Sequence, residues 1–107
     1  MRGPELVCRV RCLKDIVARA SGHFVQIATI GGENFSAYIL LEPNARMKAG
    51  DVVEVPCGFL APEMVLPLLK VGMRFPLHQV IHTLAEIEVL EITEDGRRFQ
   101  AVDGKST

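Results

Sequence analysis

The sequence contains no tryptophan, and aromatic residues of any kind make up only 6% of its 107 positions. Single-stranded nucleic acids are usually held by aromatic side chains on which bases stack, so such a platform is scarce here. The formal net charge is −1 at pH 7, whereas nucleic-acid-binding domains are usually strongly basic. Both shortages make a protein partner a stronger expectation than a nucleic acid.

Long apolar runs and paired cysteines are also missing. No apolar run approaches the ~18–20 residues of a membrane-spanning helix, and the first five residues lack the apolar stretch of a signal peptide. The three cysteines, Cys8, Cys12 and Cys57, are odd in number and show no C-x-x-C spacing. We therefore expect a cytoplasmic protein with reduced thiols, no membrane contact, no metal and no cofactor.

What the sequence does contain is a series of short, β-type segments separated by glycine and proline. Its length and its hydrophobic fraction of 49% fit one domain with its own core, residues 1–107. Short strands at such regular spacing predict an all-β fold, a small antiparallel barrel or a sandwich. The expected strands cover residues 6–13, 23–30, 35–41, 52–55, 73–78, 83–92 and 98–102, and residues 103–107 form a polar tail.

Local signals refine this expectation. Gly31-Gly32 predicts a hairpin turn between the second and third strands, and Asp95-Gly96 predicts another before the last strand. The alternation of apolar and polar residues slips at Val89-Leu90, which is typical of a β-bulge or of a strand buried on both faces. Residues 61–70 have room for one helical turn that begins near Pro62, since Pro67 forbids a long helix.

The charges are unevenly distributed along the chain. Basic residues, among them Arg9, Arg11 and Arg19, crowd the first fifth, while Glu86 and Glu88 belong to a late acidic segment. The basic group is a candidate partner-binding face. The favoured alternative is that two strands neutralise each other, because opposite charges across a strand pair contribute roughly 0.2–1 kcal/mol each.

Two segments carry a family resemblance. Residues 47–55, Met-Lys-Ala-Gly-Asp-Val-Val-Glu-Val, resemble the turn and valine-rich strand in the third domain of elongation factor Tu-type translation GTPases. Residues 71–77, Val-Gly-Met-Arg-Phe-Pro-Leu, are similar to the glu-gly-met-arg-phe strand opening of that domain, and the likeness covers residues 47–92. It implies a small antiparallel β-barrel with the first and last long strands side by side, and a non-catalytic module that binds a component of the translation machinery.

The sequence also departs from that family. It has no G-x-x-x-x-G-K-[ST] phosphate loop, so the barrel comes without a GTPase site. Val80-Ile81 replaces the family's Gly-Gly hairpin turn, and the basic, aromatic stretch that helps the family hold tRNA is not readable between Lys14 and Leu41. Nucleic-acid binding therefore stays a weaker alternative, and no residue is assigned to it.

A small metal protein or a Cys/His-dependent enzyme is the rival hypothesis. His78 and His82 are too far apart on one strand to share an ion, but would face each other if Val80-Ile81 made a tight turn. Cys57 lies in a Pro-Cys-Gly segment that predicts a turn and an exposed thiol. A nucleophile needs a base and an orienting group nearby, and the sequence shows no such pairing, so we expect no catalytic residues.

The apolar stretch at residues 64–69 is unusual for a proline-rich connection, because loops are normally polar. One interpretation is that it plugs an end of the barrel. The other is that Met64, Leu66, Leu68 and Leu69 form an exposed patch for a protein partner or a second copy of the chain.

Overall fold

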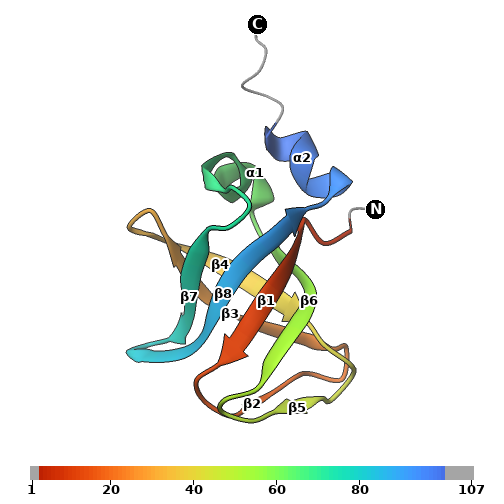
Figure 1. Cartoon of the computed structure of the whole chain (residues 1–107), viewed down its shortest axis with the longest axis vertical. Coiled ribbons are helices and arrows are strands. Elements are labelled where there is room, and N and C mark those ends of the chain that lie inside the picture. Colours follow the sequence, from red (N-terminus) through yellow and green to blue (C-terminus); the bar gives the residue numbers. More distant parts are fainter. Residues whose placement is uncertain (1–2, 101–107) are drawn as a thin grey trace, which may run out of the picture.

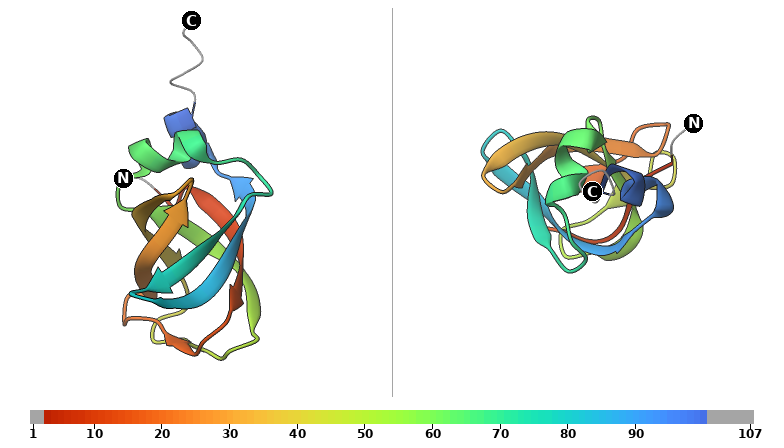
Figure 2. Two further views of the ribbon diagram at one scale, coloured as in Figure 1. Left: turned by 90° about the vertical axis from the view of Figure 1, so that its left-hand side faces the viewer. Right: turned by 90° about the horizontal axis from the view of Figure 1, so that it is seen from above.

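A computed structural model describes residues 3–100 and shows six strands closed into an antiparallel barrel, in the order β1-β6-β4-β3-β7-β8 (Figure 1). The prediction of an all-β, small antiparallel barrel is therefore confirmed. Two further strands, β2 and β5, pair with each other at one end, and short helices cover the other end (Figure 2). The elements are β1 (Leu6–Cys12), β2 (Ile16–Val17), β3 (His23–Ile30), β4 (Glu33–Leu40), β5 (Arg46–Met47), β6 (Val52–Phe59), α1 (Pro62–Val65), η1 (Leu66–Leu68), β7 (Arg74–Gln79), β8 (His82–Ile92) and α2 (Glu94–Gln100).

The alternation of side chains along β1 sets which residues enter the core. Leu6, Cys8, Val10 and Cys12 are buried inside the barrel, and the residues between them face outward. β8 follows the same rule from Ala85 to Val89, and at Leu90 the register against β1 shifts between Val7 and Cys8. The bulge expected from the sequence is thus confirmed.

Two tight turns connect the main hairpins. Gly31 and Gly32 have φ angles of 61° and 83°, the left-handed values that a type I′ turn between β3 and β4 requires. Val80 and Ile81 make the corresponding turn between β7 and β8. Only Val80 of that pair has a positive φ, 53°, which is the pattern of a type II′ turn. The first central position of such a turn usually belongs to glycine.

One end of the barrel is capped by α1, η1 and α2 (Figures 1 and 2). α1 begins at Pro62, as expected, and Pro67 lies in the first turn of η1. Gln100 of α2 donates from Nε2 to the main-chain oxygens of Leu66 and Leu69, each at 2.8 Å, and so joins α2 to η1. These bonds satisfy carbonyl groups at the end of a short helical segment.

The predicted hairpin at Asp95-Gly96 is wrong, because the chain forms α2 there instead. The predicted strand at residues 98–102 is wrong for the same reason over the part that ends at Gln100. Thr93 precedes this helix, and its Oγ1 accepts a hydrogen bond from the Gly96 amide at 3.2 Å. That is the geometry of an N-cap, and it competes with a turn at the same residues. Residues 101–102 of that strand and the polar tail at 103–107 lie outside the described part of the chain.

β6 is longer than the sequence indicated, since it continues through Pro56 to Phe59. Proline is tolerated there because the β4–β6 ladder begins only at Cys57, which pairs with Ile39. The strand is therefore paired with β1 from Val52 to Cys57 and with β4 only from Cys57 to Phe59. Within residues 3–100, no helix has both the length and the apolar character that crossing a membrane demands.

Candidate interaction surfaces

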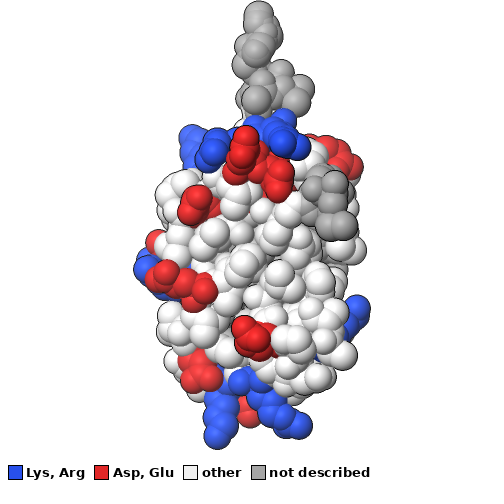
Figure 3. Space-filling view, turned by 90° about the vertical axis from the view of Figure 1, so that its right-hand side faces the viewer, with Lys and Arg blue, Asp and Glu red and all other residues white. Residues whose placement is uncertain are grey.

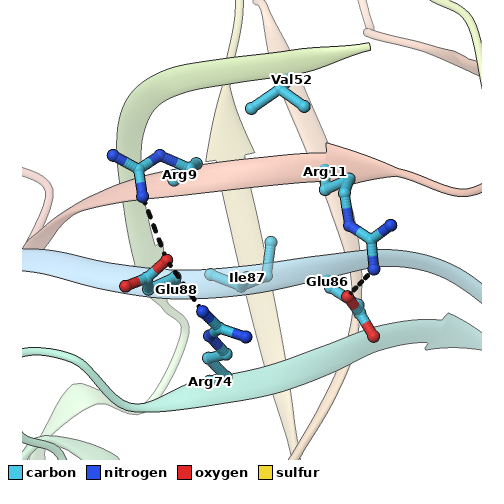
Figure 4. Close-up of a pocket in the computed structure, with 7 residues that line it drawn as sticks. All are labelled: Arg9, Arg11, Val52, Arg74, Glu86, Ile87 and Glu88. Atoms are coloured by element: carbon cyan, nitrogen blue, oxygen red, sulfur yellow. Dashed lines mark hydrogen bonds and ion pairs between the residues drawn. The ribbon is translucent and has the colours of Figure 1, made fainter. Parts of the chain in front are cut away.

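The outward face of four neighbouring strands carries one row of alternating charges. Figure 4 shows three of its members, Arg9, Glu88 and Arg74. The register places Glu54, Arg9, Glu88 and Arg74 side by side on β6, β1, β8 and β7. Arg9 lies 3.3 Å from Glu54 and 3.2 Å from Glu88, and Arg74 lies 3.9 Å from Glu88. Each interior member of this row thus has a partner of opposite sign on both sides.

A second row lies next to it, where Arg11 pairs with Glu86 and Val52 is half-exposed. The two rows border a shallow depression of about 300 Å³ (Figure 4). Its arginines are matched by carboxylates, so it presents no excess positive charge to a phosphate. The structure thus confirms that the two charged strands neutralise each other. These exposed pairs mainly stabilise the sheet, each by roughly 0–1 kcal/mol.

Arg19 does not join this face. It lies in the connection between β2 and β3, where its main-chain oxygen accepts hydrogen bonds from Gly22 and Asn44 at 2.8 and 2.9 Å. The expected second partner face of Arg9, Arg11 and Arg19 is therefore corrected: only the first two arginines lie together, and both are ion-paired.

The apolar stretch at residues 64–69 is divided between the core and the surface. Leu66 and Leu69 are 0% and 2% exposed, so they belong to the plug that closes the barrel and cannot contact a partner in this structure. Met64 and Leu68 are 62% and 46% exposed. The stretch is thus divided between the plug and the surface, since positions of a short helical turn face different sides.

Two further members of this exposed set are not evident from the sequence pattern. Leu60 and Val71 flank the helical cap, and each is 62% exposed. Together with Met64 and Leu68 they make up what we call the apolar end surface, the four exposed large apolar side chains of the segment from Leu60 to Val71. Several exposed apolar side chains in one short segment are a stronger sign of an interaction site than a single one.

The histidines and cysteines of the rival hypothesis are dispersed. His78 lies opposite Thr83 in the β7–β8 register and contacts Thr29 Oγ1 through Nε2 at 2.6 Å, while His82 lies opposite Gln79. Across residues 3–100, no three His, Cys, Asp or Glu side chains gather where they could hold one metal ion. The two histidines therefore do not face each other across the hairpin.

Cys57 was expected in an exposed turn, and this was wrong because Cys57 is a buried residue of β6. Burial raises the pKa of the Cys57 thiol well above its usual range, and a hydrogen bond to the Cys8 thiol raises it further. Burial, followed by the charge of Asp51, also raises the pKa of Cys12. Thiols in this state are poor nucleophiles, since the thiolate is the reactive form.

A buried carboxylate at the capped end was not visible in the sequence pattern. Glu5 is 3% exposed, and its Oε1 accepts a hydrogen bond from the Phe59 amide at 2.9 Å. A methyl group on Gly58 would lie 2.7 Å from that Oε1 and 2.5 Å from the hydroxyl of Tyr38. Gly58 therefore permits the side chain of Glu5, which immediately precedes β1, and that of Tyr38 on β4 to converge above β6. The cavity beside Tyr38 and Gly58 holds only about 10 Å³, which leaves no room for a substrate.

Comparison with known proteins adds no relative to this picture. No protein-family model matches the chain, and no curated protein sequence matches it.

Proposed function

We propose that this chain is a non-catalytic interaction module whose barrel presents the apolar end surface to a protein partner. The observation that carries the proposal is the exposure of Leu60, Met64, Leu68 and Val71 on a cap whose other residues close the core. Burying these side chains against a partner would remove apolar area from water at roughly 25 cal/mol per Å². A rigid cap also loses little conformational entropy on binding.

The cap is well suited to hold such a surface in place. Val65 and Leu66 are fully buried beneath it, and α2 is bonded to it through Gln100. The exposed side chains are therefore presented by a short, anchored segment. Charged residues such as Glu63 and Lys70 lie next to them in sequence and are exposed, as is usual at the polar rim of an interface.

The resemblance over residues 47–92 guides the choice of partner. It favours a component of the translation machinery, or a protein that meets a translation-factor barrel. The ion pairing of Arg9 and Arg11 favours a protein over a nucleic acid, because these arginines already contact carboxylates. Contact with RNA and self-assembly are the alternatives that the experiment must separate.

The test is affinity capture of the chain from its native lysate, with and without nuclease, using three forms of the protein. The first is the wild type, and the second carries Met64→Ser and Leu68→Ser. The third, a matched control, carries Val80→Ser and Ile81→Ser, which replace equally apolar side chains on the exposed turn far from the cap (Figure 1). Urea unfolding of all three establishes that each remains folded.

We expect a nuclease-resistant partner on the wild type and the control, and loss of that partner from the Met64/Leu68 variant. Mass spectrometry then tests whether it belongs to the translation machinery. Loss of the partner on nuclease treatment would favour RNA, and equal capture by all three forms would overturn the role of the apolar end surface. A solution mass well above the 11.8 kDa of one chain, abolished in the Met64/Leu68 variant, would point to self-assembly.

A further inference from the structure

The barrel wall has a weak seam between β4 and β6. Their ladder consists of three residue pairs, from Ala37/Phe59 to Ile39/Cys57, and it stops where Pro56 follows along β6. Beyond that point β4 ends at Leu40, and the chain leaves towards β5. Within residues 3–100, the first half of β6 therefore has β1 on one side and no paired strand on the other.

The register shows which main-chain groups face this opening. The Cys12 amide donates to the main-chain oxygen of Asp51, which lies opposite it on the β6 side. Hydrogen-bonded and non-bonded pairs alternate along an antiparallel ladder. The pairs Val10/Val53 and Cys8/Val55 therefore also exchange hydrogen bonds between β1 and β6. The intervening residues of β6, Val52 and Glu54, point their N–H and C=O groups the other way. The bond from the Leu60 amide to the Ser36 oxygen on β4 leads to the same result. Every second residue back along β6 from Leu60, Glu54 and Val52 included, points its main-chain groups towards the β4 side.

Val52 and Glu54 thus offer two donors and two acceptors along an open strand edge. No strand pairing among residues 3–100 covers that side of either residue. Such an edge is a template for an added strand. Pro56 lacks the N–H that would otherwise extend the β4 ladder, and so it limits pairing with β4.

A groove of about 550 Å³ lies along this edge, within the range of ligand sites. Its walls are mainly apolar, with Leu40 and Leu41 on one side and the half-buried Val53 and Val55 on the other. The right-hand side of Figure 1, where β4 ends and β6 runs, faces the viewer in Figure 3. The middle of that face is largely uncharged apart from one acidic group below its centre, and the other charged side chains lie at its ends and edges.

The charge of the groove selects the occupant. Among the described residues, its lining includes two exposed carboxylates, Glu42 and Glu54, and no basic residue. Glu54 is shared with Arg9 on the barrel wall, so Glu42 carries most of the unpaired negative charge of the groove. A second copy pairing through the same edge would bring like charges together, which disfavours it. A strand whose outward side chains are basic would instead lie beside Glu54 while its inward side chains filled the apolar groove.

We propose that β6 and this groove bind an extended segment of a partner protein, with alternating basic and apolar residues, by strand addition. The site is separate from the apolar end surface, so either proposal can fail without the other. Main-chain bonds to Val52 and Glu54 would supply affinity, and side chains of alternate residues would supply specificity.

The test uses three acetylated, amidated heptapeptides, which begin and end with lysine and alternate it with valine. One is unmodified, one is N-methylated on its lysines, and one is N-methylated on its valines. The peptide is taken to pair antiparallel to β6, as both neighbours of β6 in the barrel do. If valine then enters the groove beside Val53 and Val55, the lysines lie beside Glu54 and their N–H groups face β6. A fourth peptide replaces every lysine with glutamate and reverses the charge.

We expect the unmodified lysine peptide to bind at least tenfold more tightly than the glutamate peptide. N-methylation of the lysines should abolish binding, and N-methylation of the valines should preserve it. Glu42→Lys should reduce the preference for the lysine peptide severalfold, since no side-chain bond or ion pair of Glu42 is seen within residues 3–100. Equal binding of the two charge types, or no binding of the lysine peptide at millimolar concentration, would overturn the proposal.

Amide hydrogen exchange of the free chain tests independently whether the β6 edge is open. The amides of Val53 and Val55 should be protected, while those of Val52 and Glu54 exchange rapidly and become protected only with the lysine peptide. Slow exchange of Val52 and Glu54 in the free chain would show that the edge is already covered and would overturn the proposal. Peptide-induced NMR shifts confined to Met64 and Leu68 would also overturn it, because they would place the binding on the apolar end surface.

Discussion

Arg9 and Glu88 are 79 residues apart in sequence, yet they lie directly opposite each other on β1 and β8, with Nη1 and Oε1 3.2 Å apart. Arg9 also contacts Glu54, on the other neighbouring strand. One arginine therefore lies between two carboxylates and holds three strands in register through their outward faces.

This position makes Arg9 more important for stability than Arg11, which contacts Glu86 alone among the described carboxylates. We expect Arg9→Ala to lower the free energy of unfolding by about 1 kcal/mol and Arg11→Ala by about half of that. Removing Arg9 leaves Glu54 and Glu88 facing each other across β1 without a cation. Urea unfolding at low salt measures both changes. The difference should shrink in 1 M NaCl, where the Debye length is about 3 Å, and equal effects at low salt would contradict the shared role.

A second prediction concerns the close approach at Gly58. A methyl group there would lie 2.5 Å from the Tyr38 hydroxyl and 2.6 Å from Tyr38 Cζ. We expect Gly58→Ala to lower the free energy of unfolding by about 1–3 kcal/mol, the usual range for overpacking. Combining it with Tyr38→Ala should give a smaller loss than the sum of the two single changes, because the obstructing ring is gone. Additive losses in this double-mutant cycle would contradict the contact.

Most of the barrel could be predicted from local patterns, because side-chain alternation and turn chemistry act over a few residues. The β1 core residues, the Gly31-Gly32 turn and the bulge at Leu90 all follow from such patterns. The helix α2 could not be predicted from local patterns, because Asp95-Gly96 is compatible with a turn and with a helix. The choice depends on packing against a distant segment: Gly96 lies so close to the main-chain oxygen of Glu5 that a methyl group would clash.

The surfaces were harder to predict than the fold. The pairing of Arg9 and Arg11 with glutamates followed from strand order, and it was predicted correctly. The division of residues 64–69 into buried and exposed positions depends on how a short helical cap is oriented on the barrel, which periodicity over so few residues does not fix. The open edge of β6 depends on where β4 stops pairing, a property of two strands together.

A third prediction concerns backbone strain at Val80. Its φ of 53° lies in the left-handed region, which costs a residue with a β-carbon roughly 1–2 kcal/mol. Val80 and Ile81 are 84% and 85% exposed, so neither side chain contributes much packing. We expect Val80→Gly to raise the free energy of unfolding by about 0.5–1 kcal/mol after the entropy of the unfolded glycine is included. Ile81→Gly should lower it. Thermal unfolding measures both, and changes of the same sign would contradict the assigned turn.

The last prediction links the buried Cys57 thiol to alkaline stability. In the folded state its pKa is raised by burial and by the hydrogen bond to Cys8, whereas an unfolded thiol titrates near about 8.5. The proton is therefore lost from the unfolded chain first, and the folded chain binds more protons as pH rises above that value. Its contribution to stability is fully present below about pH 8 and is lost as pH rises further, by up to about 1.4 kcal/mol per pH unit.

The measurement is urea unfolding of the wild type and of Cys57→Ala, under reducing conditions, from pH 7 to pH 10.5. Cys57→Ala should be less stable at pH 7 because it leaves a cavity beside Cys8. Above pH 8.5 its stability should fall less steeply than that of the wild type, so the two curves converge. Other groups that titrate in this range affect both proteins equally, and the difference between the curves isolates Cys57. Parallel curves over the whole range would show that the thiol does not hold its proton in the folded barrel.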